Sequence, residues 1–201
     1  MTEPAQCDRP LRLTVVCTGS VNAANLPWWI AGLRLTTDDV DVRVVVTRSA
    51  ARFVSLDALS VISGRPALLD AWPDGAVRAL HVDLVEWSDA FAVYPATAHS
   101  IARLAHGMTD TPSMLALQST RAPIVVAPAL PEGILDSPAL RRNLAALAEW
   151  ENLTLAAPVK GRSWTTGRDG AAVPPPLPHL VDDLRRRLAE ADPRRDPTCT
   201  P

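Results

Sequence analysis

The sequence has few cysteines and no long hydrophobic run, and each of these shortages excludes a class of protein. Its three cysteines are far apart, which is not the spacing of a disulfide framework or a zinc site. The four histidines show no ligand-like spacing either, so we expect no bound metal. The first apolar run, residues 11–16, is too short for a signal sequence or a membrane span. We therefore expect a cytoplasmic protein with no membrane partner.

Size and charge narrow the remaining possibilities. The chain has 201 residues, of which 47% are hydrophobic, and this is enough for one domain with a sizeable core. The net charge is −2, whereas nucleic-acid-binding domains are strongly basic, so we expect no nucleic-acid partner. Lys160 is the only lysine among 20 cationic residues, so a single arginine says little about function.

Short apolar runs alternate with longer helical segments along most of the chain. We expect strands at residues 11–16, 41–46, 90–94, 124–127 and 153–156. We expect helices at residues 23–35, 49–59, 98–105, 137–150 and 180–189. This alternation predicts an α/β fold with a single doubly wound parallel sheet, Rossmann-like and flavodoxin-type, with helices on both faces.

The remaining segments suggest the domain limits. We expect a flexible arm at 1–10, the folded domain at 11–192 and a disordered tail at 193–201. Inside the domain, residues 64–75 and 160–178 look irregular. The second segment follows the last expected strand, so it should emerge at the carboxyl edge of the sheet, where ligands bind in this architecture. We expect its first part, about 160–173, to form a clamp loop.

Two loops at expected strand ends carry groups that suit a phosphate. Gly19 and Ser20 lie between the first strand and the first helix, where a phosphate can sit on the helix N-terminus. The three-glycine dinucleotide pattern is absent, which favours a mononucleotide over NAD. An ordinary serine-capped turn explains the same residues equally well. Thr47 and Ser49 end the second strand, and the residues alone favour a helix cap there.

Later segments carry a resemblance to a known family. His81-Val82-Asp83-Leu84 is followed by Ser88-Asp89, by Pro-Ala-Thr-Ala-His-Ser at 95–100, and by Gly107 to Asp110. In this order and spacing the chain resembles the homo-oligomeric flavin-containing cysteine decarboxylases. It is most similar to the peptidyl-cysteine decarboxylases of lanthipeptide biosynthesis, and the family also includes phosphopantothenoylcysteine decarboxylase. The resemblance spans about residues 11–170.

The resemblance implies a flavin cofactor, FMN, with FAD in a minority of relatives. It implies that the phosphate and ribityl chain are held by Gly19, Ser20, Val21, Thr47 and Ser49. The second flavin-binding motif of the family corresponds to Thr97, Ala98, His99 and Ser100. His99 stands where the family usually has asparagine, and an imidazole still donates one hydrogen bond.

The resemblance also implies the reaction and the catalytic residue. His81 corresponds to the family's active-site histidine, although without the resemblance a lone histidine is read as structural. An imidazole can accept a thiol or amide proton and return it later. Hydride transfer from the cysteine Cβ to the flavin gives a thioaldehyde, whose C=S group takes up the electrons as carbon dioxide leaves. The product is a peptidyl aminoenethiol, which relatives convert to an aminovinyl-cysteine ring.

The implied partners are a precursor peptide with a C-terminal cysteine and further copies of the chain. In relatives the flavin sits at a subunit contact within a homotrimer, and trimers often build a dodecamer. The clamp cations Lys160, Arg162 and Arg168 are candidates to bind the peptide's carboxylate, and a solvated surface loop is the alternative for each of them.

Two departures from the family bear on function. Pro131 stands where relatives have an asparagine that contacts the substrate, and proline has neither a side-chain amide nor a backbone N–H. This change motivates an alternative function, a non-catalytic or regulatory flavin-binding subunit. The sequence also has no cysteine between Cys17 and Cys199. That absence disfavours the other alternative, phosphopantothenoylcysteine decarboxylase, which uses a later flap cysteine.

Overall fold

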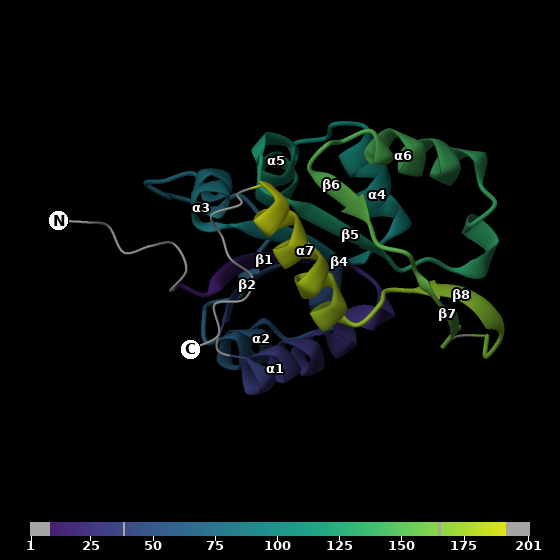
Figure 1. Ribbon diagram of the computed structural model, residues 1–201, viewed down its shortest axis with the longest axis horizontal. Coiled ribbons are helices and arrows are strands. Elements are labelled where there is room, and N and C mark those ends of the chain that lie inside the picture. Colours follow the sequence, from purple (N-terminus) through teal and green to yellow (C-terminus); the bar gives the residue numbers. More distant parts are fainter. Residues whose placement is uncertain (1–8, 38, 165, 192–201) are drawn as a thin grey trace.

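The computed structural model describes residues 9–37, 39–164 and 166–191, and this part of the chain is built around a six-stranded parallel sheet (Figure 1). The order across the sheet is β3-β2-β1-β4-β5-β6. The strands are β1 (Leu11–Cys17), β2 (Val40–Val46), β3 (Leu68–Leu69), β4 (Ala90–Ala96), β5 (Ile124–Pro128) and β6 (Leu153–Leu155). Because the strand order reverses between β1 and β4, the sheet is doubly wound. The predicted α/β fold is confirmed.

Helices cover both faces of the sheet, and alternating strand side chains divide the core into two layers. In β1, the side chains of Leu13, Val15 and Cys17 belong to one layer, while that of Val16 belongs to the other. The first layer contacts α1 (Leu26–Thr36), α2 (Leu56–Ser63) and α7 (Leu177–Ala191). The second contacts α3 (Leu80–Trp87), α4 (Ala98–Ala105), α5 (Pro112–Ser119) and α6 (Pro138–Ala148). This double burial explains why the strands are apolar at almost every position.

The carboxyl ends of the strands form an edge that we call the carboxyl rim: the loops after β1, β2, β4 and β5. Three short 3₁₀ helices follow these ends: η2 (Val21–Asn25), η3 (Ala50–Arg52) and η4 (Glu132–Ile134). Backbone hydrogen bonds continue just past the strands, from Thr47 N to Cys17 O (3.0 Å) and from Ala129 N to Ala96 O (2.8 Å). The rim crosses the point where the strand order reverses, which is where open α/β sheets bind ligands.

The segment expected to be irregular at 160–178 is ordered, and that expectation was wrong. It contains an antiparallel hairpin of β7 (Val159–Arg162) and β8 (Asp169–Val173), and α7 begins before the segment ends. Reciprocal backbone hydrogen bonds between Leu130 and Ala172 (2.9 and 3.0 Å) join the hairpin to the chain just beyond β5. The backbone groups of this Gly-, Ser- and Thr-rich segment are therefore paired across a hairpin, and the hairpin lies at the carboxyl rim.

Other differences concern short elements. The two-residue strand β3 lies within 64–75, which was expected to be irregular, and the eight-residue helices α3 and α5 were not predicted. The helix expected at 98–105 coincides with α4. Residues 1–8 of the expected arm and the whole expected tail lie outside the described residues; Arg9 pairs with Asp89 at 2.6 Å. In the described part of the chain, no helix combines the length and apolar character needed to cross a bilayer.

Candidate functional site

The loop after β1 brings the first predicted flavin residues to the carboxyl rim. Ser20 caps η2, and its hydroxyl accepts a hydrogen bond from the N–H of Asn22 (3.3 Å). Gly19 lies against the loop after β2, because a Cβ on Gly19 would be only 2.4 Å from the Cβ of Ser49. Only glycine allows this approach. Within the described residues, the backbone N–H groups of Gly19 and Val21 have no acceptor, and such groups suit an anion.

The loop after β2 supplies two hydroxyl groups beside Gly19. Ser49 holds the N-cap position of η3, and Thr47, two residues earlier, accepts a hydrogen bond from the N–H of Ala50 (3.2 Å), the first residue of η3. The hydroxyl proton of Thr47 remains available to a ligand, because this bond uses only the oxygen as acceptor. The Ser49 side chain is exposed and makes no capping hydrogen bond. The loop can therefore cap η3 and still offer both hydroxyls at the rim.

A buried threonine connects the loops after β1 and β4. Thr18 is 2% exposed. Its hydroxyl donates to the carbonyl of Pro95 (2.6 Å) and accepts from the N–H of Thr97 (3.0 Å). Thr97 in turn caps α4, accepting from the N–H of Ser100 (3.2 Å). These bonds fix the start of α4 relative to the Gly19–Ser20 turn on the neighbouring strand.

The N-terminus of α4 adds two further backbone donors to the rim. The N–H groups of Ala98 and His99 have no acceptor among the described residues, as expected in the first turn of a helix. The helix dipole favours an anion at the same place. The His99 side chain is exposed, whereas Ser100 is buried and bonded to Thr97. The rim thus combines hydroxyls, free N–H groups and a glycine-dependent close approach, and these residues fit the phosphate and ribityl groups of a flavin.

His81 lies in the first turn of α3, whose N-terminus points to the same edge of the sheet because the helix leads back to the start of β4. Its imidazole makes an edge-to-face contact with the Trp72 indole, with centroids 5.8 Å apart and planes at 75°. Its Nδ1 atom is buried and has no hydrogen-bond partner in the described part of the chain. A buried polar atom without a partner is costly in a native protein. The Nδ1 atom of His81 is therefore a buried polar atom whose hydrogen-bonding capacity the described residues leave unused.

A chain of polar contacts holds Trp72 in this position. The indole N–H donates to the backbone carbonyl of Asp110 (3.1 Å). The Asp110 carboxylate binds Arg103, a buried residue of α4, at 2.5 Å, and Arg103 also donates to Thr111 (3.1 Å). The hydrogen bond from Arg103 lowers the pKa of Asp110, with a smaller contribution from the charge of His99. The loop between α4 and α5 is thereby held beneath Trp72.

A second part of the site lies between the rim and the hairpin. A cavity of about 190 Å³ is lined by Ser20, Val21, Pro131, Arg162 and Trp164, among others. The Leu130–Ala172 bridge holds its two walls together. The Arg162 guanidinium bonds to the carbonyl of Gly167 at the hairpin turn, which orders a cation at the wall of the cavity. The cavity is thus shared by Ser20 and Val21, which are predicted to bind the flavin, and by the predicted substrate residues Pro131 and Arg162.

The other predicted site residues lie outside this cavity. Lys160 and Arg168 are exposed on the hairpin and do not line it. His81 does not line it either; it stands with Trp72 beside α5. A single chain thus places Pro131 and Arg162 beside the loop after β1, whereas the predicted catalytic residue His81 lies outside their shared cavity.

Trp72 is a residue of the site that sequence reasoning missed. It lies in the segment expected to be irregular, nine positions before His81, and no periodic pattern connects the two. The sequence shows only a tryptophan followed by a Pro-Asp-Gly turn before the histidine, and this order does not specify a contact between the two rings. Among the described residues, no three His, Cys, Asp or Glu side chains form a group suited to a metal ion.

Comparison with known proteins gives the context of this geometry. A family model described as Flavoprotein matches residues 1–189. The cypemycin cysteine dehydrogenase (decarboxylating) of a Streptomyces species is 38% identical over 120 residues, which are 59% of this chain and 63% of that protein. The coenzyme A biosynthesis bifunctional protein CoaBC of Bacillus subtilis is 33% identical over 115 residues, 57% of this chain and 28% of that protein. The chain therefore spans less than two thirds of either relative.

A solved structure agrees with the fold and extends the match. The FMN-dependent cysteine decarboxylase SpaF superposes with a TM-score of 0.74 and 26% identity, covering 92% of this chain and 98% of that one. The two structures therefore share the fold over most of both chains.

Proposed function

Because the chain belongs to the Flavoprotein family, we propose that it oxidatively decarboxylates the C-terminal cysteine of a ribosomally made precursor peptide, using a bound flavin. The product is an aminoenethiol, which leads to an aminovinyl-cysteine ring, so the reaction belongs to lanthipeptide-type antibiotic biosynthesis in the cytoplasm. The observation that carries the proposal is the carboxyl rim, where unpaired N–H groups and hydroxyls lie at the same sheet edge as an imidazole with an unpartnered nitrogen.

The rim is the proposed flavin site, and FMN is the proposed form, with FAD as the alternative, because the similar structure of SpaF is that of an FMN-dependent enzyme. The turn after β1 and the N-terminus of α4 would bind the phosphate through Gly19, Ser20, Val21, Ala98 and His99. Thr47, Ser49, Thr97 and Ser100 would support the ribityl chain or the loops that hold it. When bound, the flavin supplies the two-electron acceptor that lets the cysteine lose its carboxylate.

His81 is the proposed acid–base residue. Its Nδ1 is unpartnered and its ring is fixed by Trp72, so the imidazole is oriented before the substrate arrives. We propose that it takes a proton from the thiol or the adjacent amide and returns it to the product. The Nδ1 atom is buried although the residue is half-exposed, so water is kept from this nitrogen.

The hairpin cavity is the proposed site for the end of the peptide. Arg162 lines it and can bind a carboxylate, while Lys160 and Arg168 could meet the peptide from outside it. Pro131 forms part of the wall through its ring and contributes no N–H. Replacing Arg162 with glutamine should raise KM for a cysteine-terminated peptide about tenfold. Arg168→Gln, a matched change on the same hairpin, should have a smaller effect.

We further propose that the active protein is a homotrimer, with a dodecamer as the larger assembly. His81 does not line the cavity formed by Pro131 and Arg162, so a second copy that covers the rim would bring the two parts of the site together. Light scattering of the flavin-loaded protein tests this assembly. A catalytically competent monomer would contradict it.

The test of the reaction is direct. The absorbance spectrum of the purified protein, with mass analysis of the released chromophore, should show FMN. Anaerobic mixing with peptides that end in cysteine should bleach the flavin and reduce peptide mass by one carbon dioxide and two hydrogens. A colourless protein that refuses added flavin would contradict the whole proposal.

The second candidate is a non-catalytic flavin-binding subunit, favoured by Pro131 in place of the family asparagine. It predicts a yellow protein that no cysteine-terminated peptide bleaches. Phosphopantothenoylcysteine decarboxylation is a third reading, disfavoured because the hairpin carries serine, tryptophan and threonine but no cysteine. That activity would appear as a saturated thiol product with the flavin returned to its oxidised form.

A further inference from the structure

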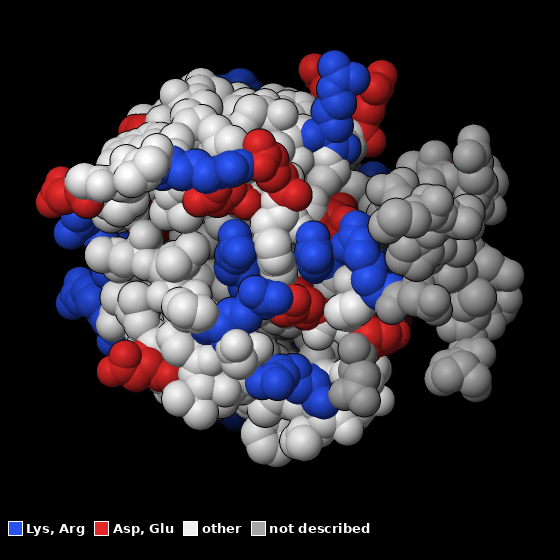
Figure 2. Space-filling view, turned by 90° about the vertical axis from the view of Figure 1, so that its left-hand side faces the viewer, with Lys and Arg blue, Asp and Glu red and all other residues white. Residues whose placement is uncertain are grey.

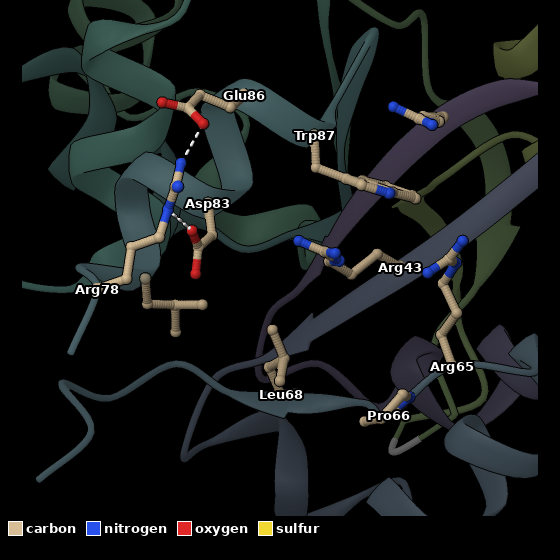
Figure 3. Close-up of a pocket in the computed structure, with 10 residues that line it drawn as sticks. Arg43, Arg65, Pro66, Leu68, Arg78, Asp83, Glu86 and Trp87 are labelled. Carbon is tan, nitrogen blue, oxygen red and sulfur yellow. Dashed lines mark hydrogen bonds and ion pairs between the residues drawn. The ribbon is translucent and has the colours of Figure 1, made fainter. Parts of the chain in front are cut away.

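The face of the sheet that carries α3 has a strip that no described helix covers. There, β1, β2 and the segment before β3 form a floor beside α3, hollowed into a cavity of about 530 Å³ (Figure 3). Four arginines line it, Arg12, Arg43, Arg65 and Arg78, together with Trp87. We call these five residues and the hollow between them the arginine groove. The side of the molecule that carries α3 shows arginine side chains close together near its centre (Figure 2).

The position of Arg43 is unusual for a strand of this fold. Val42 and Val44 of β2 point into the first core layer, so Arg43 between them points to the opposite face. Strands of parallel sheets are normally apolar on both faces, although Arg43 lies on a part of β2 that β3 does not reach, since β3 pairs only with Val45 and Val46. Arg43 is half-buried, and within the described residues no carboxylate lies at hydrogen-bond distance from its guanidinium. The sheet therefore carries a cation at a place where packing alone would favour an aliphatic residue.

The arginines of the groove differ in the groups that they contact. Arg78 is paired with Asp83 and Glu86, and Arg65 is paired with Asp41 at 2.5 Å. Arg43 instead stacks on Trp87, with its guanidinium carbon 4.3 Å from the ring centroid, and Arg65 approaches the same ring at 5.1 Å. Figure 3 shows Arg43 and Arg65 directed toward this indole.

The guanidinium groups of Arg43 and Arg65 carry like charges and lie against the same indole, so an anion bound beside them would be favourable. Burial lowers the pKa of Arg43 and the positive charge of Arg65 lowers it further, while the charges of Asp83 and Asp41 act in the opposite direction. An anion in the groove would relieve this repulsion, and the planar guanidinium of Arg43 can offer a carboxylate two parallel N–H donors.

The groove also has an apolar side and leads toward the proposed catalytic residue. Pro66, Leu68 and Leu80 line it together with the arginines, and Leu80 is the immediate neighbour of His81. Helix α3, which forms one wall, has eight residues and is about 12 Å long at 1.5 Å per residue. An extended peptide at about 3.3 Å per residue would place roughly four residues along it.

We propose that the arginine groove binds an acidic and apolar segment of the substrate peptide, upstream of its C-terminal cysteine. This inference rests on the proposed function, because it assumes a peptide whose end reaches the neighbourhood of His81. Arg43 is the central anchor for a peptide carboxylate, and Leu68 and Leu80 contact an adjacent apolar side chain. A nucleic acid fits less well, because every nucleotide carries a phosphate and some phosphates would face Asp83 and Glu86, whereas a peptide can place an apolar side chain there.

Fluorescence anisotropy of the flavin-loaded protein tests the groove without any reaction. The probe is a short labelled peptide that alternates glutamate with leucine and ends in an amide, and its counterpart has glutamine in place of glutamate. The acidic peptide should bind more tightly, and added salt should weaken it. Arg43→Gln should raise its Kd about tenfold. Arg142→Gln, the same change on exposed α6, should leave Kd unchanged.

A thermal unfolding curve shows whether the Arg43 variant is folded; if it is not, Arg12→Gln replaces it, with the same expected loss of binding. Equal binding of the two peptides, or an unchanged Kd in the groove variants, would overturn the proposal. A groove variant that changes only the number of subunits in light scattering would also overturn it, because a second copy of the chain would then fill the groove. Tighter binding of single-stranded DNA than of the acidic peptide would overturn it as well.

Turnover separates this inference from the proposed reaction. A neutral cysteine-terminated peptide tests decarboxylation without the groove, and adding upstream glutamates should raise kcat/KM about tenfold in the wild type but not in Arg43→Gln. Bleaching with both peptides at equal kcat/KM would contradict the groove and keep the reaction. Arg43-dependent binding without bleaching by any peptide would keep the groove and contradict the reaction.

Discussion

The indole of Trp72 meets the imidazole of His81 edge to face at 5.8 Å, and the Trp72 N–H is bonded to the backbone of Asp110. Through Asp110 and Arg103, the orientation of His81 is connected to α4, whose first turn belongs to the proposed flavin site. The proton-transfer group and the cofactor site are thus positioned by one continuous set of contacts.

Trp72→Ala should lower kcat for peptide decarboxylation about tenfold while flavin binding is retained. The edge-to-face contact contributes about 1 kcal/mol to the position of the ring, and a misplaced general base loses rate. Trp72→Phe keeps the contact and should restore most of the rate. Trp28→Ala, an exposed tryptophan on α1, is the control. Equal rates in the alanine and phenylalanine variants would mean that Trp72 does not position His81.

His81→Asn should leave the protein yellow and reduce turnover by about 10²–10⁴-fold, the usual contribution of a general acid–base residue. The measurement pairs the flavin absorbance spectrum with peptide mass after anaerobic incubation. His106→Asn, a change at an exposed histidine, should behave as the wild type. Normal turnover by His81→Asn would remove this imidazole from the mechanism.

Periodicity in the sequence was enough to find the long elements but not the pairings between distant segments. The short apolar run 41–46 predicted β2, and the helical segment 98–105 predicted α4. The hairpin was missed because its order comes from pairing across the turn and from the Leu130–Ala172 bridge, which no local pattern encodes.

In the candidate site, too, local patterns predicted the position of residues along the chain but not the contacts between distant segments. Motif order located the rim residues and His81, and each lies at a strand end or helix start. The contact of His81 with Trp72, and the shared cavity of Pro131 and Arg162, depend on how separate loops pack. Such contacts are tertiary, so neither propensity nor spacing could specify them.

Gly19→Ala should weaken flavin binding and destabilise the fold by about 1–3 kcal/mol, the usual cost of overpacking. The new Cβ would overlap the Cβ of Ser49 at 2.4 Å and push apart the loops after β1 and β2. Gly32→Ala in α1 is the matched control, since a Cβ there meets nothing within 4 Å. It should stabilise the helix by about 0.5–1 kcal/mol. Flavin titration and thermal unfolding of both variants measure the difference, and equal flavin affinity would refute the close-approach argument.

Ala172→Pro should raise KM for the peptide about tenfold with little change in flavin content. Proline removes the N–H that donates to Leu130 (3.0 Å), so the hairpin loses one of the two bonds that fix it to the chain just beyond β5. Ala172→Ser keeps this N–H and serves as the control. Steady-state kinetics with a cysteine-terminated peptide measure the effect, and an unchanged KM would show that the hairpin does not hold the substrate.

Acid should release the loop held by Asp110. Arg103 lowers the pKa of Asp110 below its ordinary value of 3.8, so the ion pair stabilises the fold fully above that value. The contribution is lost as the pH falls through the lower pKa of the folded state. Asp110→Asn should therefore lower Tm near neutral pH by a few degrees at most, because half-exposed pairs are weakened by solvent. The two Tm curves should converge as the pH falls below 3.8, and a difference that persisted in acid would show that the pair is not its cause.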